Sequence, residues 1–187
     1  MKKTAAPYRI LGIDPGTNLL GYAILEVHGR QLAPKELGVV RMTHLKTHQE
    51  KLKMIFNRLQ TIIDVHAPTC MAVEAPFFGK NVQAMLKLGR AQGVAIAAGM
   101  TKNLEVTEYA PRKIKQSVTG KGNASKEQVQ AMLEQILKFP LHDHYLDATD
   151  ALATALCHHY QSGNPLTGGK RYSGWDAFLT DNPNRRG

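Results

Sequence analysis

An acidic residue stands near the start of this chain, at a place where a strand must end. Asp14 follows the apolar stretch of residues 10–13, and Pro15 and Gly16 come directly after it. These two residues stop a strand because proline fixes φ and glycine adopts backbone angles that other residues avoid. An aspartate in an ordinary β-turn is the structural alternative. The pattern also suits an active site, in which a carboxylate at a strand end lies beside a phosphate.

Further acidic residues favour the active-site interpretation. Glu74 follows the apolar residues 70–73 and precedes Pro76, so it also stands at the end of a strand. Asp147 and Asp150 are three positions apart in a helical pattern and therefore share one helix face. Together the pattern predicts a divalent-metal site with the ligands Asp14, Glu74, Asp147 and Asp150.

Separate carboxylates select a particular class of metal. Oxygen ligands without a Cys or His cluster at zinc spacing favour hard cations, here Mg²⁺ with Mn²⁺ as a substitute. Two such ions about 4 Å apart can activate water and stabilise the leaving oxygen of a phosphodiester. The matching reaction is hydrolysis of a nucleic-acid backbone.

Hydrophobic periodicity predicts the elements that would position these acids. Strands are expected at 9–13, 21–27, 37–42, 71–74 and 104–109. Helices are expected at 50–65, 82–100, 111–118, 126–138 and 147–161. The first three strands would form an antiparallel meander, and the strand at 71–74 would join it in parallel after a helical crossover.

Composition limits the class of protein. A chain of 187 residues fits one domain with an ordinary core, and its net charge of +9 attracts polyanions such as nucleic acid. The two cysteines exclude a disulfide framework and indicate a reducing compartment. No apolar run is long enough to span a membrane, and too few residues precede the first strand for a secretory signal. The expected location is cytoplasmic.

The order of these parts resembles the ribonuclease H-like fold, an α/β class with a mixed five-stranded sheet flanked by helices. Three of its strands are antiparallel and two are parallel. Over about residues 9–160, the chain resembles more narrowly the RuvC family of Holliday junction resolvases. The resemblance rests on residues 11–16 (LGIDPG), 21–22 (GY), 73–74 (VE), 87–95 (KLGRAQGVA), 128–130 (QVQ) and 147–153 (DATDALA).

The resemblance implies a function and its partners. Asp14, Glu74, Asp147 and Asp150 would be the catalytic acids, with two metal ions at each site. The substrate would be four-way junction DNA, cut symmetrically in recombination and repair by a homodimer that works with a RuvA–RuvB branch-migration complex. Asp143 is a rival for the third acid, and its neighbours His142 and His144 could also assist the metal, although all three belong to an expected loop.

Several residues are predicted to contact DNA. By the resemblance, Phe77 stacks on bases near the junction centre, and Lys115 and Lys126 aid binding and cleavage. Arg112 and Lys121 extend the same basic patch. Core packing for Phe77 and an ordinary solvated face for the basic residues are the alternatives.

The helix expected at 82–100 has an unusual composition. Residues 94–100 are apolar on every side, so the segment is expected to be buried all round, while Gly89 and Gly93 would need close packing to offset their helix cost of about 1 kcal/mol each. A second copy of the chain could provide that packing. Burial inside a single domain is the alternative.

A nuclease domain is expected at 1–161, followed by a basic, flexible tail at 162–187 that contains the apolar cluster Trp175–Leu179. Three other functions remain open. The chain could be a ribonuclease H-like nuclease for RNA or an RNA–DNA hybrid, or a DNA-binding module without catalysis. It could also be an ATP-binding module of the actin and Hsp70 type, although that fold needs two such domains and this chain has one phosphate-loop motif.

Overall fold

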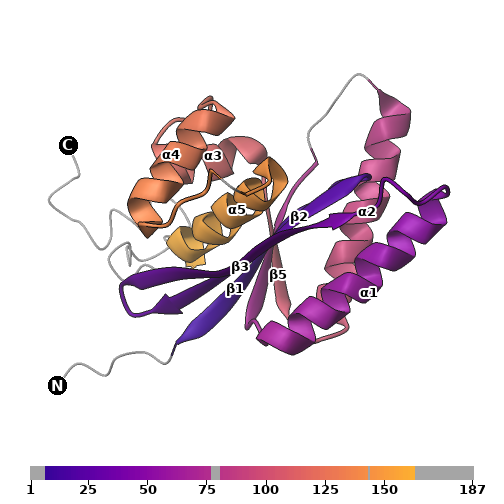
Figure 1. The fold of residues 1–187 in the computed structure, drawn as a ribbon, viewed down its shortest axis with the longest axis horizontal. Coiled ribbons are helices and arrows are strands. Elements are labelled where there is room, and N and C mark those ends of the chain that lie inside the picture. The colour runs from indigo at the N-terminus through magenta and orange to yellow at the C-terminus, as the bar shows by residue number, and fades with distance from the viewer. Residues whose placement is uncertain (1–6, 77–80, 143, 163–187) are drawn as a thin grey trace, which may run out of the picture.

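The computed structural model describes residues 7–76, 81–142 and 144–162. Five strands form one mixed sheet in the order β3-β2-β1-β4-β5, with helices on both faces (Figure 1). Strands β1 to β3 are antiparallel, whereas β4 pairs in parallel with β1 and β5 in parallel with β4. The predicted fold class, an α/β ribonuclease H-like sheet, is therefore confirmed.

The meander consists of β1 (Tyr8–Asp14), β2 (Leu19–His28) and β3 (Gln31–Arg41). β3 begins earlier than the apolar pattern predicts, because its first half is a polar edge. That half contains Pro34, opposite Leu25, at a point where the pairing register shifts. A proline is tolerated there because an edge strand leaves one side of its backbone unpaired.

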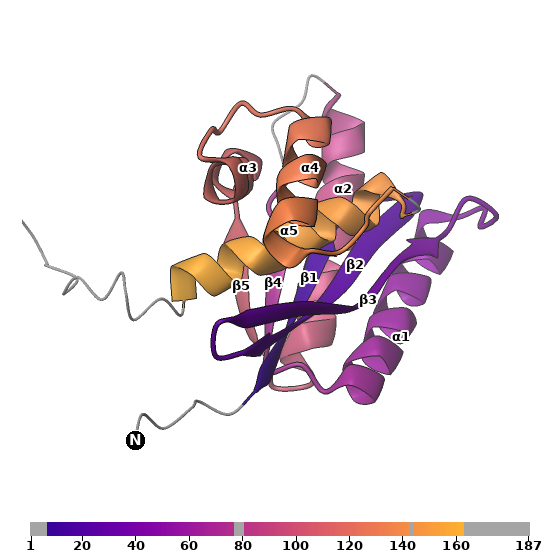
Figure 2. The ribbon, with the colours of Figure 1, turned by 60° about the vertical axis from the view of Figure 1, so that its left-hand side comes forward.

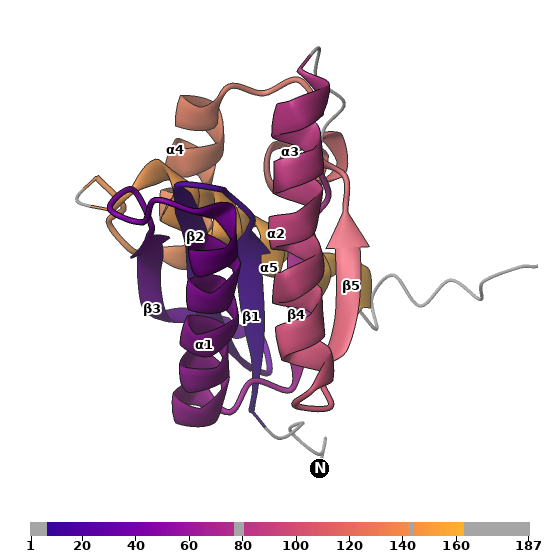
Figure 3. The ribbon, with the colours of Figure 1, turned by 90° about the vertical axis from the view of Figure 1, so that its right-hand side faces the viewer.

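One face of the sheet carries α1 (His48–His66) and α2 (Val82–Met100), which lie side by side (Figure 3). A capping box starts α1: the Thr47 hydroxyl accepts from the Glu50 amide, and the Glu50 carboxylate accepts from the Thr47 amide. Helix α1 follows β3 and leads to β4 (Cys70–Glu74), and helix α2 follows β4 and leads to β5 (Glu105–Tyr109). The N-terminal ends of both helices therefore lie at the carboxyl end of the parallel strands.

The other face carries α3 (Pro111–Thr119), α4 (Lys126–Leu137) and α5 (Leu146–Ser162). Helix α5 lies across β1 and β2, with α4 outside it (Figure 2). Alternation along the strands divides the core into two layers: Ile10 packs toward α5, and Leu11 packs toward α1 and α2. Within residues 7–76, 81–142 and 144–162, every helix is too short or too polar to cross a membrane.

Helix α2 differs from the expectation that residues 94–100 are buried on every side. Ala95 and Ala98 are buried, but Gly93 and Ala97 are exposed, and Met100 is 63% exposed. A Cβ atom built on Gly89 or Gly93 would meet nothing within 4 Å. The expectation of all-round burial is wrong for the single chain, because α1 and the sheet cover only one side of α2.

The predicted boundary after residue 161 lies at the end of α5, which continues to Ser162. The rest of the predicted tail, including Trp175–Leu179, lies outside the described residues. Its flexibility therefore stays a prediction.

Candidate active site

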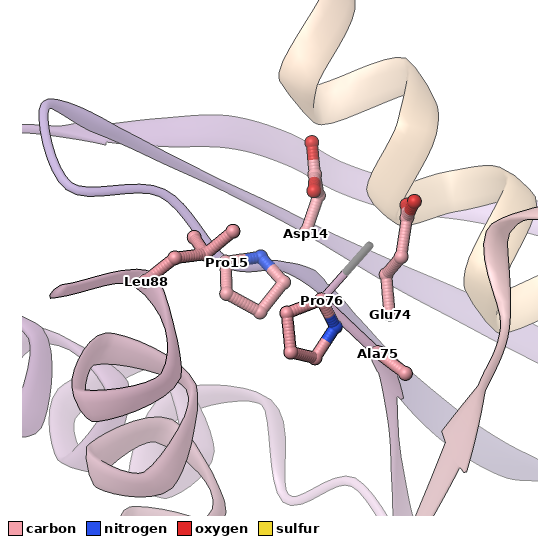
Figure 4. A pocket seen from close by; sticks show the side chains of 6 residues that line it. All are labelled: Asp14, Pro15, Glu74, Ala75, Pro76 and Leu88. Carbon is pink, nitrogen blue, oxygen red and sulfur yellow. The ribbon is translucent and has the colours of Figure 1, made fainter. Parts of the chain in front are cut away.

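Asp14 and Glu74 end neighbouring parallel strands. The register pairs Ile13 of β1 with Val73 of β4, so the next residue of each strand is one of these acids. Both carboxyl groups project to the same side (Figure 4). Pro15 and Pro76, which stop the strands, line the same cavity of about 160 Å³.

Two glycines determine how closely α5 approaches these strands. A Cβ atom on Gly12 would lie 2.1 Å from the Ala151 carbonyl oxygen, and one on Gly21 would lie 1.9 Å from the Asp147 carbonyl oxygen. The helix backbone therefore rests directly on the strands, and Gly21 is paired with Asp14. This contact holds the first turn of α5, with Asp147 and Asp150, beside the strand-end acids.

Burial and neighbouring acids raise the pKa values of Asp14 and Glu74. Burial raises the pKa of Asp14 to about 8, and the charges of Glu74, Asp150 and Asp147 add to this shift. Burial also raises the pKa of Glu74 to about 7, with a further contribution from Asp150 and opposition from Lys126 and Lys115. Carboxylates in this setting need a nearby cation to stay ionised at neutral pH.

Lys126 provides one such cation. Its ammonium group contacts the Asp150 carboxylate at 2.5 Å. Burial lowers the pKa of Lys126, but the hydrogen bond and charge of Asp150, with the charges of Asp14 and Asp147, outweigh burial and raise it. Lys115 and Lys126 both line a second cavity, of about 240 Å³, together with Asp14, Glu74 and Asp150.

The donor chemistry of the site suits a hard divalent cation, because Asp14 and Glu74, both with raised pKa values, line one cavity together with Asp150. In the part of the chain that the structure describes, no three His, Cys, Asp or Glu side chains already converge as ligands. The ion pair between Lys126 and Asp150 occupies one of the four acids.

The other predicted residues have different positions. Arg112 lies against Gly122, and Lys121 lines a separate groove with Gln128 and Met132, so neither belongs to the acid cavities. Their predicted contact with DNA stays a prediction.

The loop residues are only partly described. His144 packs against the Phe139 ring, with ring centroids 5.7 Å apart. Phe77 and Asp143 lie outside the described residues, so the stacking prediction and the rival third acid stay untested. The charge of Asp147 does act on Asp14, as its predicted role requires.

Sequence reasoning missed the ion pair between Lys126 and Asp150, which are 24 positions apart. It also missed Leu88, which lines the cavity beside Asp14. Neither contact has a local sequence signal, because each joins separate elements through the tertiary fold.

The chain is similar to known proteins over most of its length. The family model described as "Crossover junction endodeoxyribonuclease RuvC" matches residues 10–158. A Cytophaga hutchinsonii protein of that name is 53% identical over 176 residues, which cover 94% of this chain and 86% of that protein. A second relative with the same name, from Porphyromonas gingivalis, is 49% identical over 94% of this chain and 95% of its own length.

A solved structure supports the same assignment. The structure described as "T. thermophilus RuvC in complex with Holliday junction substrate" superposes with a TM-score of 0.76 and 29% identity. The match covers 82% of this chain and 93% of that chain. This protein belongs to the RuvC family of crossover junction endodeoxyribonucleases.

Proposed function

We propose that this protein is an endonuclease that resolves Holliday junctions by paired, metal-dependent phosphodiester hydrolysis in DNA recombination and repair. The observation that carries the proposal is the pair of strand-end acids, Asp14 and Glu74, facing Asp147 and Asp150 on α5 in a chain of the RuvC family. Neither a DNA-binding module nor an ATP-binding module of the actin type accounts for four acids gathered beside a basic patch.

Asp14, Glu74, Asp147 and Asp150 are the proposed metal ligands. Their oxygen donors favour Mg²⁺, with Mn²⁺ as a substitute and two ions at each site. When bound, the ions would activate water for attack on the phosphorus and neutralise charge on the leaving oxygen. The acids would hold the metal at the end of β1 and β4, in the cavities that Asp14 and Glu74 line.

Lys126 and Lys115 complete the proposed site. Lys126 is paired with Asp150. Its ammonium group would also stabilise developing negative charge on the phosphate, as a positioned cation does. Lys115 lies on the same cavity and can contact the same strand. Arg112, Lys121 and Phe77 are proposed to bind the DNA farther from the scissile phosphate.

A homodimer fits the substrate, because a four-way junction has two-fold symmetry and needs two cuts. The exposed side of α2 carries small or apolar residues at helical spacing, which we call the α2 stripe: Val82, Leu86, Gly89, Gly93 and Met100. Val82 and Leu86 are 65% and 51% exposed, which is unusual for large apolar side chains along one helix face. We propose that the α2 stripe packs against a second copy of the chain.

Gly89→Leu is expected to convert this dimer into a folded monomer, because the new side chain meets open space within the chain but would overpack a partner. Light scattering and thermal melting measure the two effects. The matched control is Gly99→Leu on the same helix, where a Cβ atom already meets Met71 at 2.9 Å. That control should lower the melting temperature. A wild-type protein that stays monomeric at high concentration would contradict the dimer.

The remaining partners follow from the family. We propose that the protein receives junctions from a RuvA–RuvB branch-migration complex and acts in the cytoplasm, where bacterial DNA lies. The support is that its relatives are bacterial enzymes named for the crossover junction.

Incubation of the purified protein with a synthetic four-way junction, with and without Mg²⁺, tests the proposed function. The expected products are paired symmetric nicks that DNA ligase can seal, formed only with the metal. Linear duplex and an RNA–DNA hybrid of the same sequence are the matched substrates. Equal cleavage of the hybrid would favour a ribonuclease, and an uncut junction would contradict the proposal.

A further inference from the structure

The first turns of α1 and the middle of α2 bring four basic residues together, which we call the α1–α2 basic cluster: His48, Lys51, Lys87 and Arg90. The members on each helix are three positions apart and so share a face. The charges of Arg90, Lys87 and Lys51 all act on the partly buried His48 ring. The cluster is therefore a feature of the packed helices and not of one sequence segment.

Most of the cluster lacks a neutralising partner. Among residues 7–76, 81–142 and 144–162, Lys87 and Arg90 make no hydrogen bond or ion pair, and the Nε2 atom of His48 is buried without a hydrogen-bond partner. Lys51 donates to the side-chain oxygen of Asn18 at 2.7 Å, which leaves its charge uncompensated. Of the lysines in the described residues, Lys35, Lys102 and Lys126 are ion-paired with acids, and the others are not.

Like charges placed close together repel one another and create a positive potential at this surface. Burial is the main cause of the lowered pKa of His48, and the charges of Arg90, Lys87 and Lys51 lower this pKa further. The positive end of the α1 dipole lies at the same place and adds to the potential. A bound anion would reduce this repulsion, because it would pair with the cationic side chains of Lys51, Lys87 and Arg90.

The location of the cluster indicates which anion. Asn18, the partner of Lys51, belongs to the turn that follows Asp14 and Pro15. Leu88, between Lys87 and Arg90 in the chain, lies beside Pro15 and lines the cavity of Asp14 (Figure 4). Lys115 and Lys126 flank the acids from the opposite face of the sheet, on α3 and α4. The acids are thus bordered by cations on both sides.

We propose that the α1–α2 basic cluster binds the phosphate backbone of junction DNA on the flank opposite Lys115 and Lys126. The DNA strand to be cut then passes over the acids, between the α1–α2 basic cluster on one side and Lys115 and Lys126 on the other. These contacts hold the scissile phosphate over the site. This proposal rests on the proposed function, because it takes junction DNA as the ligand.

The salt dependence of binding separates phosphate contacts from other effects. Each phosphate contact contributes about 0.9 to the slope of log K against log salt, through release of condensed counterions. Lys87→Gln combined with Arg90→Gln should therefore reduce the slope by about 2 and weaken binding roughly tenfold near 0.1 M salt. Its melting temperature should be unchanged, because both side chains are exposed and make no hydrogen bond or ion pair within the described residues.

Binding of a labelled synthetic four-way junction in EDTA, titrated at several salt concentrations, measures the slope without cleavage. The matched control is Lys53→Gln combined with Lys138→Gln, which removes two exposed charges, on α1 and at the end of α4, away from the cluster. The control should keep nearly the wild-type slope. Arg90→Lys, which keeps the charge, should also keep it.

The outcomes are distinguishable. If wild type neither binds nor cuts the junction, the proposed function fails. If wild type binds and cuts but the double variant keeps its slope and affinity, this inference alone fails. An equal loss of salt slope and affinity in the control variant would also overturn the inference. Weaker binding by the double variant would overturn it too, if light scattering shows that this variant dissociates from a dimer to a monomer.

Discussion

Asp14→Asn is expected to abolish junction cleavage, with a loss of at least about 10²-fold, the scale on which one stabilising group at a reacting centre contributes. The substitution keeps the shape of the side chain but removes the charge at the end of β1 that would hold the metal. Junction binding should stay intact or become tighter, because one negative charge facing the DNA is lost. Single-turnover cleavage and a binding titration measure the two effects separately.

The same variant should be more stable than wild type in the absence of metal. The pKa of Asp14 is about 8 in the folded protein, chiefly because of burial, against about 3.9 in an unfolded chain. The folded state therefore holds a proton that the unfolded state has lost, so stability falls as pH rises from about 4 to about 8. Glu74, with a pKa of about 7, adds a loss of the same sign up to about pH 7.

Thermal melts in EDTA across this pH window test the linkage. Wild type should lose stability as the pH rises, Asp14→Asn should lose less, and Mg²⁺ should stabilise wild type more than the variant. A parallel pH dependence in both proteins would contradict the assignment of the raised pKa to Asp14. Cleavage close to the wild-type rate would remove Asp14 from the metal site.

Gly21→Ala is expected to disable the site without changing any acid. The new Cβ atom would lie 1.9 Å from the carbonyl oxygen of Asp147, so α5 must move away from β2. Overpacking of this kind typically costs about 1 to 3 kcal/mol of stability. Displacement of Asp147 and Asp150 should reduce cleavage further and raise the Mg²⁺ concentration needed for half-maximal rate.

The Mg²⁺ dependence is the informative measurement, because a purely structural defect would lower the amount of folded protein without changing it. Gly99→Ala is the matched control: it is also a buried glycine, but its close neighbour is the flexible end of the Met71 side chain. The control should keep the wild-type Mg²⁺ dependence. An unchanged Mg²⁺ requirement in Gly21→Ala would show that the spacing between α5 and the sheet does not set the metal site.

The sequence alone predicts the elements and their order well, for local reasons. Apolar runs stopped by Pro15 and Pro76 mark strand ends, and hydrophobic periodicity marks the helices. Family motifs around Asp14 and Asp147 predict membership in the RuvC family and junction cleavage, and the comparisons confirm both. The roles of the individual acids and of the DNA-binding residues stay predictions.

Other expectations from the sequence were wrong, because they depend on which surfaces of the helices and strands pack together in the folded chain. The composition of residues 94–100 predicts all-round burial, yet packing covers only one side of α2 and leaves the α2 stripe exposed. The start of β3 was missed because edge strands need no apolar alternation.

The sequence by itself determined the elements, the strand-end acids and the family, since these depend on local backbone preferences and short motifs. Only the tertiary structure decided how the acids meet. Gly12 and Gly21 admit the α5 backbone to the sheet, Lys126 pairs with Asp150, and α1 places His48 against Arg90. The physical reason is that distances, burial and charge interactions between distant segments arise from packing, which no single stretch of sequence encodes.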